Sequence, residues 1–115
     1  KTLIDNQKID LGDGSQLVVI NTPGHTSGCI CLQLIDETGK QIALFTGDTI
    51  FADSVGRTDL GGSEQELLHS ITRIKNLRTE NNDDMVVYPG HGPSLTFGEL
   101  CRNHPWMNVR GTSFI

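Results

Sequence analysis

The chain has 115 residues, of which 36% are hydrophobic and 20% are charged, and this balance is typical of one globular domain rather than of a disordered segment. The formal net charge of −5 argues against nucleic acid as a partner, because phosphate binding requires a clustered basic surface. The sequence has no apolar run of about eighteen residues and no signal-peptide pattern, so we expect no membrane span and no membrane partner.

The first half of the chain predicts strands separated by glycine-containing turns. Residues 1–10 alternate apolar and polar side chains and indicate one or two edge strands, and residues 11–15 (LGDGS) are typical of a hairpin loop. Residues 16–21 (QLVVIN) predict a strand that is buried on both faces. Residues 29–35 and 42–45 predict two further buried strands, joined by a short turn.

The second half predicts a helix, one more strand and a short final helix. Ser63 and Glu66 have the spacing of a capping box, in which each side chain bonds the backbone N–H of the other residue, and apolar residues at helical spacing follow them. Residues 85–88 (MVVY) predict a short strand, and residues 96–102 predict a short helix. His69 falls on the polar side of the first helix, so we expect it to be a surface residue.

The three cysteines, Cys29, Cys31 and Cys101, do not make a disulfide framework in a chain of this size. Cys29 and Cys31 lie two residues apart on one predicted strand and therefore point to the same face. We interpret them as buried small apolar side chains in a reducing compartment, because a C-x-C metal site would need partners that no nearby residue supplies. The expected location is the cytoplasm.

Three predicted strands end in a glycine turn that presents a side chain able to bind a metal. His25 and His91 each follow a Pro-Gly pair, and Asp48 follows a glycine. Each residue taken alone is also explained without a metal, the histidines as core or turn residues and Asp48 as a turn or helix-cap residue. Together, two imidazoles and one carboxylate at strand ends predict a site for zinc or another borderline divalent metal. A metal held in this way lowers the pKa of its bound water to about 7.

Four ordered motifs surround these residues: TPGHTSG at 22–28, FTGDTIF at 45–51, GRTD at 56–59 and YPGHG at 88–92. They resemble the metallo-β-lactamase superfamily and, within it, the glyoxalase II-like (hydroxyacylglutathione hydrolase-like) group. The resemblance implies an α/β fold of the αββα sandwich type. This chain would form half of that sandwich, a mostly antiparallel sheet with one main helix and a short C-terminal helix.

The resemblance also implies roles for individual residues. His25 would complete a three-histidine zinc site, Asp48 would bridge two metal ions at the reaction centre, and His91 would bind the second ion. Zinc is the expected cofactor, and iron and manganese are compatible with the same ligand types. Arg57 and Asp59 would brace a loop beside the site through charge-assisted hydrogen bonds rather than contact the substrate.

The first metal motif of the family, H-x-H-x-D-H, is not in this sequence, whose only histidines are His25, His69, His91 and His104. We therefore expect residues 1–115 to be the C-terminal half of a metallo-hydrolase domain. The intact parent would hydrolyse a small-molecule thioester of the glutathione type, and the isolated chain would be inactive. The N-terminal half or a second copy of the chain would be its partner.

The alternative is a non-catalytic binding or assembly module that dimerises through an uncovered sheet face.

Near the C-terminal end, the sequence Asn103-His104-Pro105-Trp106 stands where the family has Asn-Pro. Because of this departure, the sequence assigns no role to His104.

Overall fold

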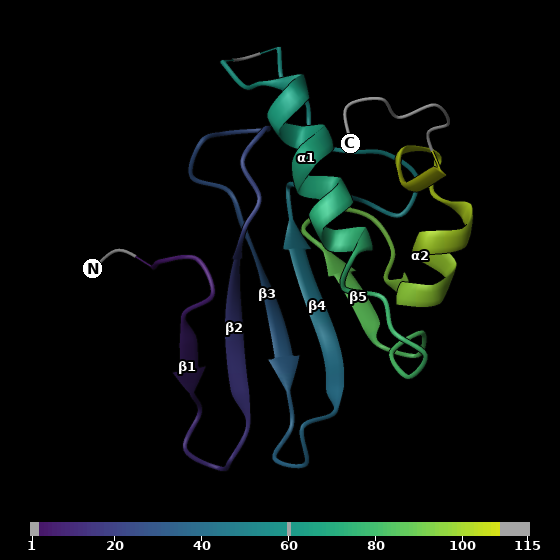
Figure 1. Ribbon diagram of the computed structural model, residues 1–115. Helices are drawn as coiled ribbons and strands as arrows, with labels where there is room; N and C mark the ends of the chain where they lie inside the picture. Colours follow the sequence, from purple (N-terminus) through teal and green to yellow (C-terminus); the bar gives the residue numbers. More distant parts are fainter. Residues whose placement is uncertain (1–2, 60, 109–115) are drawn as a thin grey trace.

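One mixed sheet of six strands, in the order β1-β2-β3-β4-β5-β6, forms the centre of the computed structural model, which describes residues 3–59 and 61–108 (Figure 1). The strands are β1 (Lys8–Asp10), β2 (Gln16–Asn21), β3 (Ile30–Ile35), β4 (Gln41–Gly47), β5 (Val86–Pro89) and β6 (Leu95–Thr96). The helices are α1 (Glu64–Lys75), α2 (Phe97–Asn103) and the 3-10 helix η1 (Pro105–Asn108). The predicted α/β class with a mostly antiparallel sheet is confirmed, because among the strands that the structure describes only the β4–β5 pair is parallel.

Strands β2, β4 and β5 run in the same direction, so their C-terminal ends lie at one edge of the sheet. β2 and β4 are each antiparallel to β3, which lies between them, and β5 is parallel to β4. Gly47 at the end of β4 lies in register with Pro89 at the end of β5. Because the three glycine turns follow these three strands, the fold brings His25, Asp48 and His91 to the same edge.

A parallel pair of neighbouring strands requires a crossover, and α1 supplies it between β4 and β5 (Figure 1). The hydroxyl of Ser63 caps α1 by accepting a hydrogen bond from the Glu66 N–H at 3.2 Å. The Ser63 N–H donates to the Gly24 carbonyl at 2.7 Å, so the predicted return bond from Glu66 is replaced by a tertiary one. This bond ties the start of α1 to the turn that carries His25.

Helices α1 and α2 pack on one face of the sheet, and the hydrophobic core lies between them and the strands (Figure 1). The sheet contributes Ile20, Cys31, Leu44 and Val87 to this core, α1 contributes Leu67, Ile71 and Ile74, and α2 contributes Phe97, Leu100 and Cys101. At roughly 1.5–3 kcal/mol for each large apolar side chain, this burial is the main force that holds the helices on the sheet.

The opposite face of the sheet is apolar and partly exposed. Phe45 on β4 pairs with Tyr88 on the neighbouring β5, and their rings stack with centroids 5.3 Å apart. The two residues are 39% and 44% exposed, respectively. Val19 and Ile20, which point to opposite faces, are both buried, as the sequence predicted for β2.

The other predicted elements agree with the structure to within about two residues, apart from the edge strand. That strand forms only over Lys8–Asp10, and residues 1–2 of the prediction lie outside the described part of the chain. Cys29 lies just before β3 and is only partly buried, whereas Cys31 is fully buried as predicted. Within residues 3–59 and 61–108, no helix combines the length and the apolar character that a membrane crossing requires.

Candidate metal centre

Asp48 lies between the two candidate histidines. Its Oδ2 atom is 4.0 Å from Nε2 of His25, and its Oδ1 atom is 3.2 Å from Nδ1 of His91. The His25 side chain is 25% exposed, whereas that of His91 is 78% exposed, so the arrangement is anchored on the His25 side and open to solvent on the other. The structure thus brings the three predicted residues together, with the carboxylate between the imidazoles.

The backbone sets the tautomer of His25. Nδ1 of His25 lies 2.6 Å from the carbonyl oxygen of Arg57. A carbonyl only accepts hydrogen bonds, so Nδ1 carries the proton and donates it. In the neutral ring Nε2 is then unprotonated, and its lone pair faces the carboxylate of Asp48. An imidazole fixed in this way, by a hydrogen bond from its other nitrogen, is the form that binds metals in proteins.

Buried threonines tie together the turns that carry His25 and Asp48. The hydroxyls of Thr22 and Thr49 lie 2.8 Å apart, and both side chains are fully buried. The hydroxyl of Thr46, also fully buried, donates to the Ile50 carbonyl at 2.8 Å. These bonds satisfy polar groups that would be costly to bury unpaired. The Thr22–Thr49 bond also fixes the position of the two turns relative to each other.

Residues 51–57 form a loop that contacts all three candidate ligands. The Phe51 ring meets the His91 ring edge-on, with centroids 5.7 Å apart. Gly56 packs so closely that an added Cβ would lie 2.0 Å from the Asp48 carbonyl and 3.0 Å from Cβ of His25. The Gly56 N–H donates to the Thr49 carbonyl at 3.1 Å. Together with the Arg57 carbonyl, these contacts make the loop one wall of the site.

The site opens into a cavity of about 320 Å³. The cavity is lined by His25, Asp48, Phe51, Val55, Gly56, Arg57 and His91. Its apolar wall comes from Phe51 and Val55, and its polar groups are the candidate ligands. A mixture of apolar lining and a few polar groups is typical of small-molecule sites.

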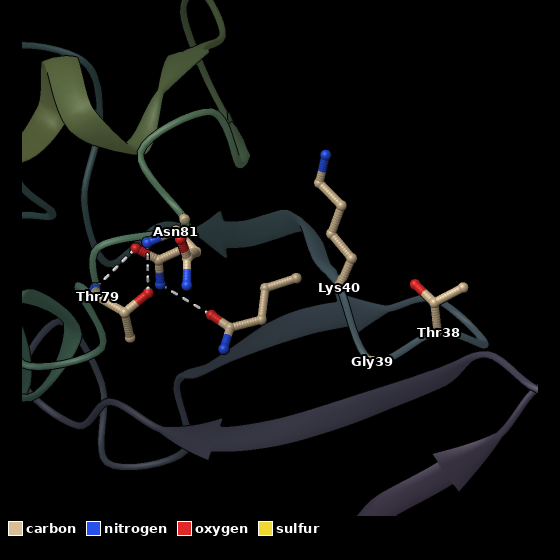
Figure 2. A pocket seen from close by; sticks show the side chains of 7 residues that line it. Thr38, Gly39, Lys40, Thr79 and Asn81 are labelled. Atoms are coloured by element: carbon tan, nitrogen blue, oxygen red, sulfur yellow. Dashed lines mark hydrogen bonds between the residues drawn. The ribbon is translucent and has the colours of Figure 1, made fainter.

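A larger cavity of about 600 Å³ lies at the opposite end of β4, between the β3–β4 hairpin and the loop that follows α1. Figure 2 shows Thr38 and Lys40 on one side of it and Thr79 and Asn81 on the other. Asn82 in its wall is buried and fully engaged, because its amide donates to Gln41 and to a backbone carbonyl. This polar cavity is separate from the cavity that is lined by His25, Asp48 and His91.

The predicted Arg57–Asp59 pair forms beside the site. Nε and the second terminal nitrogen of Arg57 donate to the two carboxylate oxygens of Asp59, both at 2.7 Å. These hydrogen bonds hold the pKa of Asp59 at about 2, well below its ordinary value. Because both side chains are exposed, the pair shapes the loop more than it stabilises the fold.

The donor atoms fit a metal in part. Within residues 3–59 and 61–108, no three His, Cys, Asp or Glu side chains are arranged to hold a metal ion by themselves. The available donors, Nε2 of His25 and the carboxylate of Asp48, are of the types that zinc binds. Metal ligation by His25, Asp48 and His91 therefore stays a prediction, and the geometry suits a centre that further ligands complete.

One residue near the site escaped the sequence reasoning. His104 follows α2 and is buried, and its Nε2 lies 2.9 Å from the carbonyl oxygen of Ser54, in the loop that forms the cavity wall. The sequence does not indicate that His104 is buried with a hydrogen-bond partner for each ring nitrogen; this is seen only in the structure.

The fold and the site define the class of protein: an α/β domain that presents imidazoles and a carboxylate at one edge of a mixed sheet. Residues 1–91 match the model of the metallo-beta-lactamase superfamily. The chain belongs to this superfamily, whose members are hydrolases, and the resemblance seen in the four sequence motifs is confirmed.

Relatives of known sequence and structure agree with this assignment. The chain is 38% identical over 98 residues to hydroxyacylglutathione hydrolase GloC of Haemophilus influenzae, covering 85% of this chain and 43% of that protein. It is 40% identical over 113 residues to the probable polyketide biosynthesis zinc-dependent hydrolase PksB of Bacillus subtilis, covering 94% and 46%, respectively. A metallo-beta-lactamase structure from Staphylococcus aureus superimposes with a TM-score of 0.79 at 31% identity, covering 93% of this chain and 34% of that one. The chain thus spans less than half the length of each.

Proposed function

We propose that this chain is the C-terminal half of a metal-dependent hydrolase domain, and that His25, Asp48 and His91 are its contribution to a centre of two divalent ions. The observation that carries the proposal is the position of Asp48 between the two histidines, 4.0 Å from Nε2 of His25 and 3.2 Å from Nδ1 of His91. A carboxylate with one oxygen facing each histidine is suited to join two metal positions. Because Nδ1 of His25 donates to the Arg57 carbonyl, Nε2 is the ring nitrogen left to bind a metal.

The residues of the chain have distinct tasks in this proposal. The Arg57 carbonyl holds the His25 ring in the ligating tautomer, and Phe51 packs against the His91 ring. When bound, the divalent ions, zinc in this proposal, would supply hydroxide at neutral pH and polarise a carbonyl group. The cavity of about 320 Å³ leaves room beside Asp48 for a small acyl group.

The proposed substrate is a small-molecule thioester of the hydroxyacylglutathione type. The support is the similarity to GloC, whose name states that activity. PksB, which is similar to the same extent, carries the name of a different zinc-dependent hydrolase. A thioester is a suitable substrate because its thiol has a pKa of only about 8.5, so the thiolate can leave without first receiving a proton.

The remaining ligands would come from outside this chain. Two features support this part of the proposal: the chain spans less than half of its relatives, and the sheet face that carries Phe45 and Tyr88 is apolar and partly exposed. A second layer packed on that face would bury the two rings and could deliver the missing histidines to the same edge. Since loss of even one supporting group costs a large factor in metal affinity or activity, the isolated chain would be inactive.

The second candidate function, a non-catalytic module that dimerises through the same face, rests on the exposure of Phe45 and Tyr88 alone. Light scattering of the 115-residue chain at low micromolar concentration decides it. A dimer that the substitution Tyr88→Glu converts to a monomer would favour the module. A monomer for both would remove this candidate.

The experiment that tests the hydrolase compares the longer protein that carries this chain with the 115-residue chain, each supplied with zinc. Thiol release from a hydroxyacylglutathione thioester is the readout. We expect turnover by the longer protein, loss of about 100-fold or more in its Asp48→Asn variant, and no turnover by the isolated chain. His69→Gln, a change on the exposed side of α1, is the control and should keep full activity. Turnover that survives Asp48→Asn would contradict the proposal.

A further inference from the structure

His104 is a fully engaged histidine in the interior of the protein. It follows the last turn of α2, is only 1% exposed, and has hydrogen-bond partners for both ring nitrogens. Nε2 lies 2.9 Å from the carbonyl oxygen of Ser54, and Nδ1 lies 3.0 Å from the backbone N–H of Trp106. A side chain of this kind is held in one orientation from two sides.

The two partners also fix the protonation of the ring. The carbonyl of Ser54 can only accept a hydrogen bond, so Nε2 carries a proton and donates it. The N–H of Trp106 can only donate, so Nδ1 is unprotonated and accepts. His104 is therefore neutral, and its ring forms a rigid link between the end of α2 and the loop at 51–57.

His104 bonds the 51–57 loop at its tip, and this loop contacts all three candidate ligands. The Ser54 carbonyl also accepts from the Phe51 N–H at 2.8 Å, which closes the tip of the loop. From this tip, Phe51 packs edge-on against His91. Further along, Gly56 packs against the backbone of Asp48, and the carbonyl of Arg57 accepts from Nδ1 of His25.

The two ends of the 51–57 loop are bonded to each other and to the segment that follows β4. His104 bonds the tip of the loop from the end of α2. At the ends, Ile50 and Val55 form an isolated antiparallel bridge, and the Gly56 N–H donates to the Thr49 carbonyl. The hydrogen bond from His104 to Ser54 joins residues that are 50 positions apart in the sequence. It therefore couples the helical layer to the cavity wall.

We propose that His104 is a positioning residue for the metal centre, which acts by holding the 51–57 loop through the carbonyl of Ser54. This inference rests on the proposed function, because the loop has ligands to position only if the centre forms. His104 itself contacts neither metal nor substrate.

Two substitutions separate the contact with the loop from the local contact with Trp106. In His104→Asn, the side-chain oxygen can still accept from the Trp106 N–H, but the side chain is too short to reach Ser54. In His104→Gln, the side-chain amide can extend to the position of Nε2 and donate to Ser54. Cys101→Ala is the matched control, because it removes the buried sulfur of Cys101 from α2 and leaves the hydrogen bond from His104 to Ser54 in place.

The experiment uses the longer protein that carries this chain and has two readouts besides activity. The first is zinc affinity, measured by competition with a chelator. The second is the imidazole ¹⁵N signals of His25 in the metal-free protein, which report whether Nδ1 still donates to the Arg57 carbonyl. We expect His104→Asn to weaken zinc binding by about 10-fold or more and to alter the His25 signals. We expect His104→Gln to restore most of both, and Cys101→Ala to change neither.

The outcomes are distinguishable. Wild-type affinity and unchanged His25 signals in His104→Asn would overturn the inference and leave the proposed function intact. A His104→Gln variant as weak as His104→Asn would also overturn it, because the effect would then not come from the contact with Ser54. If the wild type itself binds no zinc, the proposed function fails and the inference fails with it.

Discussion

The hydroxyls of Thr22 and Thr49 meet at 2.8 Å in the interior, directly behind the turns that present His25 and Asp48. Thr22 is the last residue before the Pro-Gly-His turn, and Thr49 is the first residue after Asp48. Their hydrogen bond therefore joins the two turns at their bases. The thiol of Cys31 lies 3.6 Å from the Thr22 hydroxyl and extends this buried polar cluster.

Removing one hydroxyl of this pair should destabilise the fold by leaving the other without its partner. We expect Thr22→Val to lower the free energy of unfolding by about 1–3 kcal/mol, and Thr22→Ser, which keeps the hydroxyl, to cost less. The double variant Thr22→Val/Thr49→Val should cost less than the sum of the two single changes. Urea unfolding of the wild type, the two single valine variants, the double variant and Thr22→Ser measures this. Strictly additive effects of the two valine changes would show that the hydroxyls do not interact.

Gly56 should tolerate no side chain. An added Cβ would lie 2.0 Å from the Asp48 carbonyl, so Gly56→Ala must push the loop away from Asp48 and His25. We expect a loss of about 1–3 kcal/mol or more in the free energy of unfolding, as for other overpacked sites. Gly28→Ala is the control, since a Cβ there meets no atom within 4 Å. Equal unfolding free energies for the two variants would mean that the packing at Gly56 is looser than described.

The sequence predicted the parts of the site better than their assembly. The strands and glycine turns around His25, Asp48 and His91 are local features, set by runs of apolar residues and by backbone freedom at glycine. The reason why the turns meet is not local, because it depends on the parallel pairing of β4 with β5 across the α1 crossover. The position of the three residues at strand ends predicted one shared site, and the family resemblance supported it, but the strand pairing that brings them together is seen only in the structure.

Two features lay beyond the sequence for the same reason. The Ser63 N–H bonds the Gly24 carbonyl instead of Glu66, because α1 docks against the His25 turn and offers a tertiary acceptor. The contact of His104 with Ser54 also depends on tertiary packing. Contacts of this kind cannot be predicted from sequence periodicity or spacing. A short-range rule such as the capping box predicts the wrong partner for a residue that bonds a distant part of the chain.

The cysteines should differ sharply in reactivity. Burial raises the pKa of the Cys31 thiol to about 11, so its reactive thiolate is scarce at pH 8 as well as shielded. Cys29, just outside β3, is partly exposed. We expect iodoacetamide to label Cys29 in the native protein and Cys31 only after unfolding, as read by mass spectrometry of peptides. Equal labelling rates in the native state would contradict the burial of Cys31.

Asp5 should make stability depend on acid pH. The backbone N–H of Asn21, and next Arg73, lower the pKa of the Asp5 carboxyl below its ordinary value of 3.8. A lowered folded-state pKa gives stability that is present above about pH 4 and is lost as the pH falls through the folded value. Because the pair is partly exposed, we expect Asp5→Asn to cost no more than about 1 kcal/mol at pH 7. The difference from the wild type should shrink below pH 4 in urea unfolding series, and a constant difference down to pH 2 would refute this origin.

The central claim is that Asp48 joins His25 and His91 into one metal centre. Anomalous scattering at the zinc absorption edge, from crystals of the proposed intact hydrolase loaded with zinc, tests it most directly. We expect zinc peaks within about 2.2 Å of Nε2 of His25 and of a carboxylate oxygen of Asp48, with His91 bound to one of the ions. Zinc bound elsewhere in the protein, with none in contact with Asp48, would contradict it.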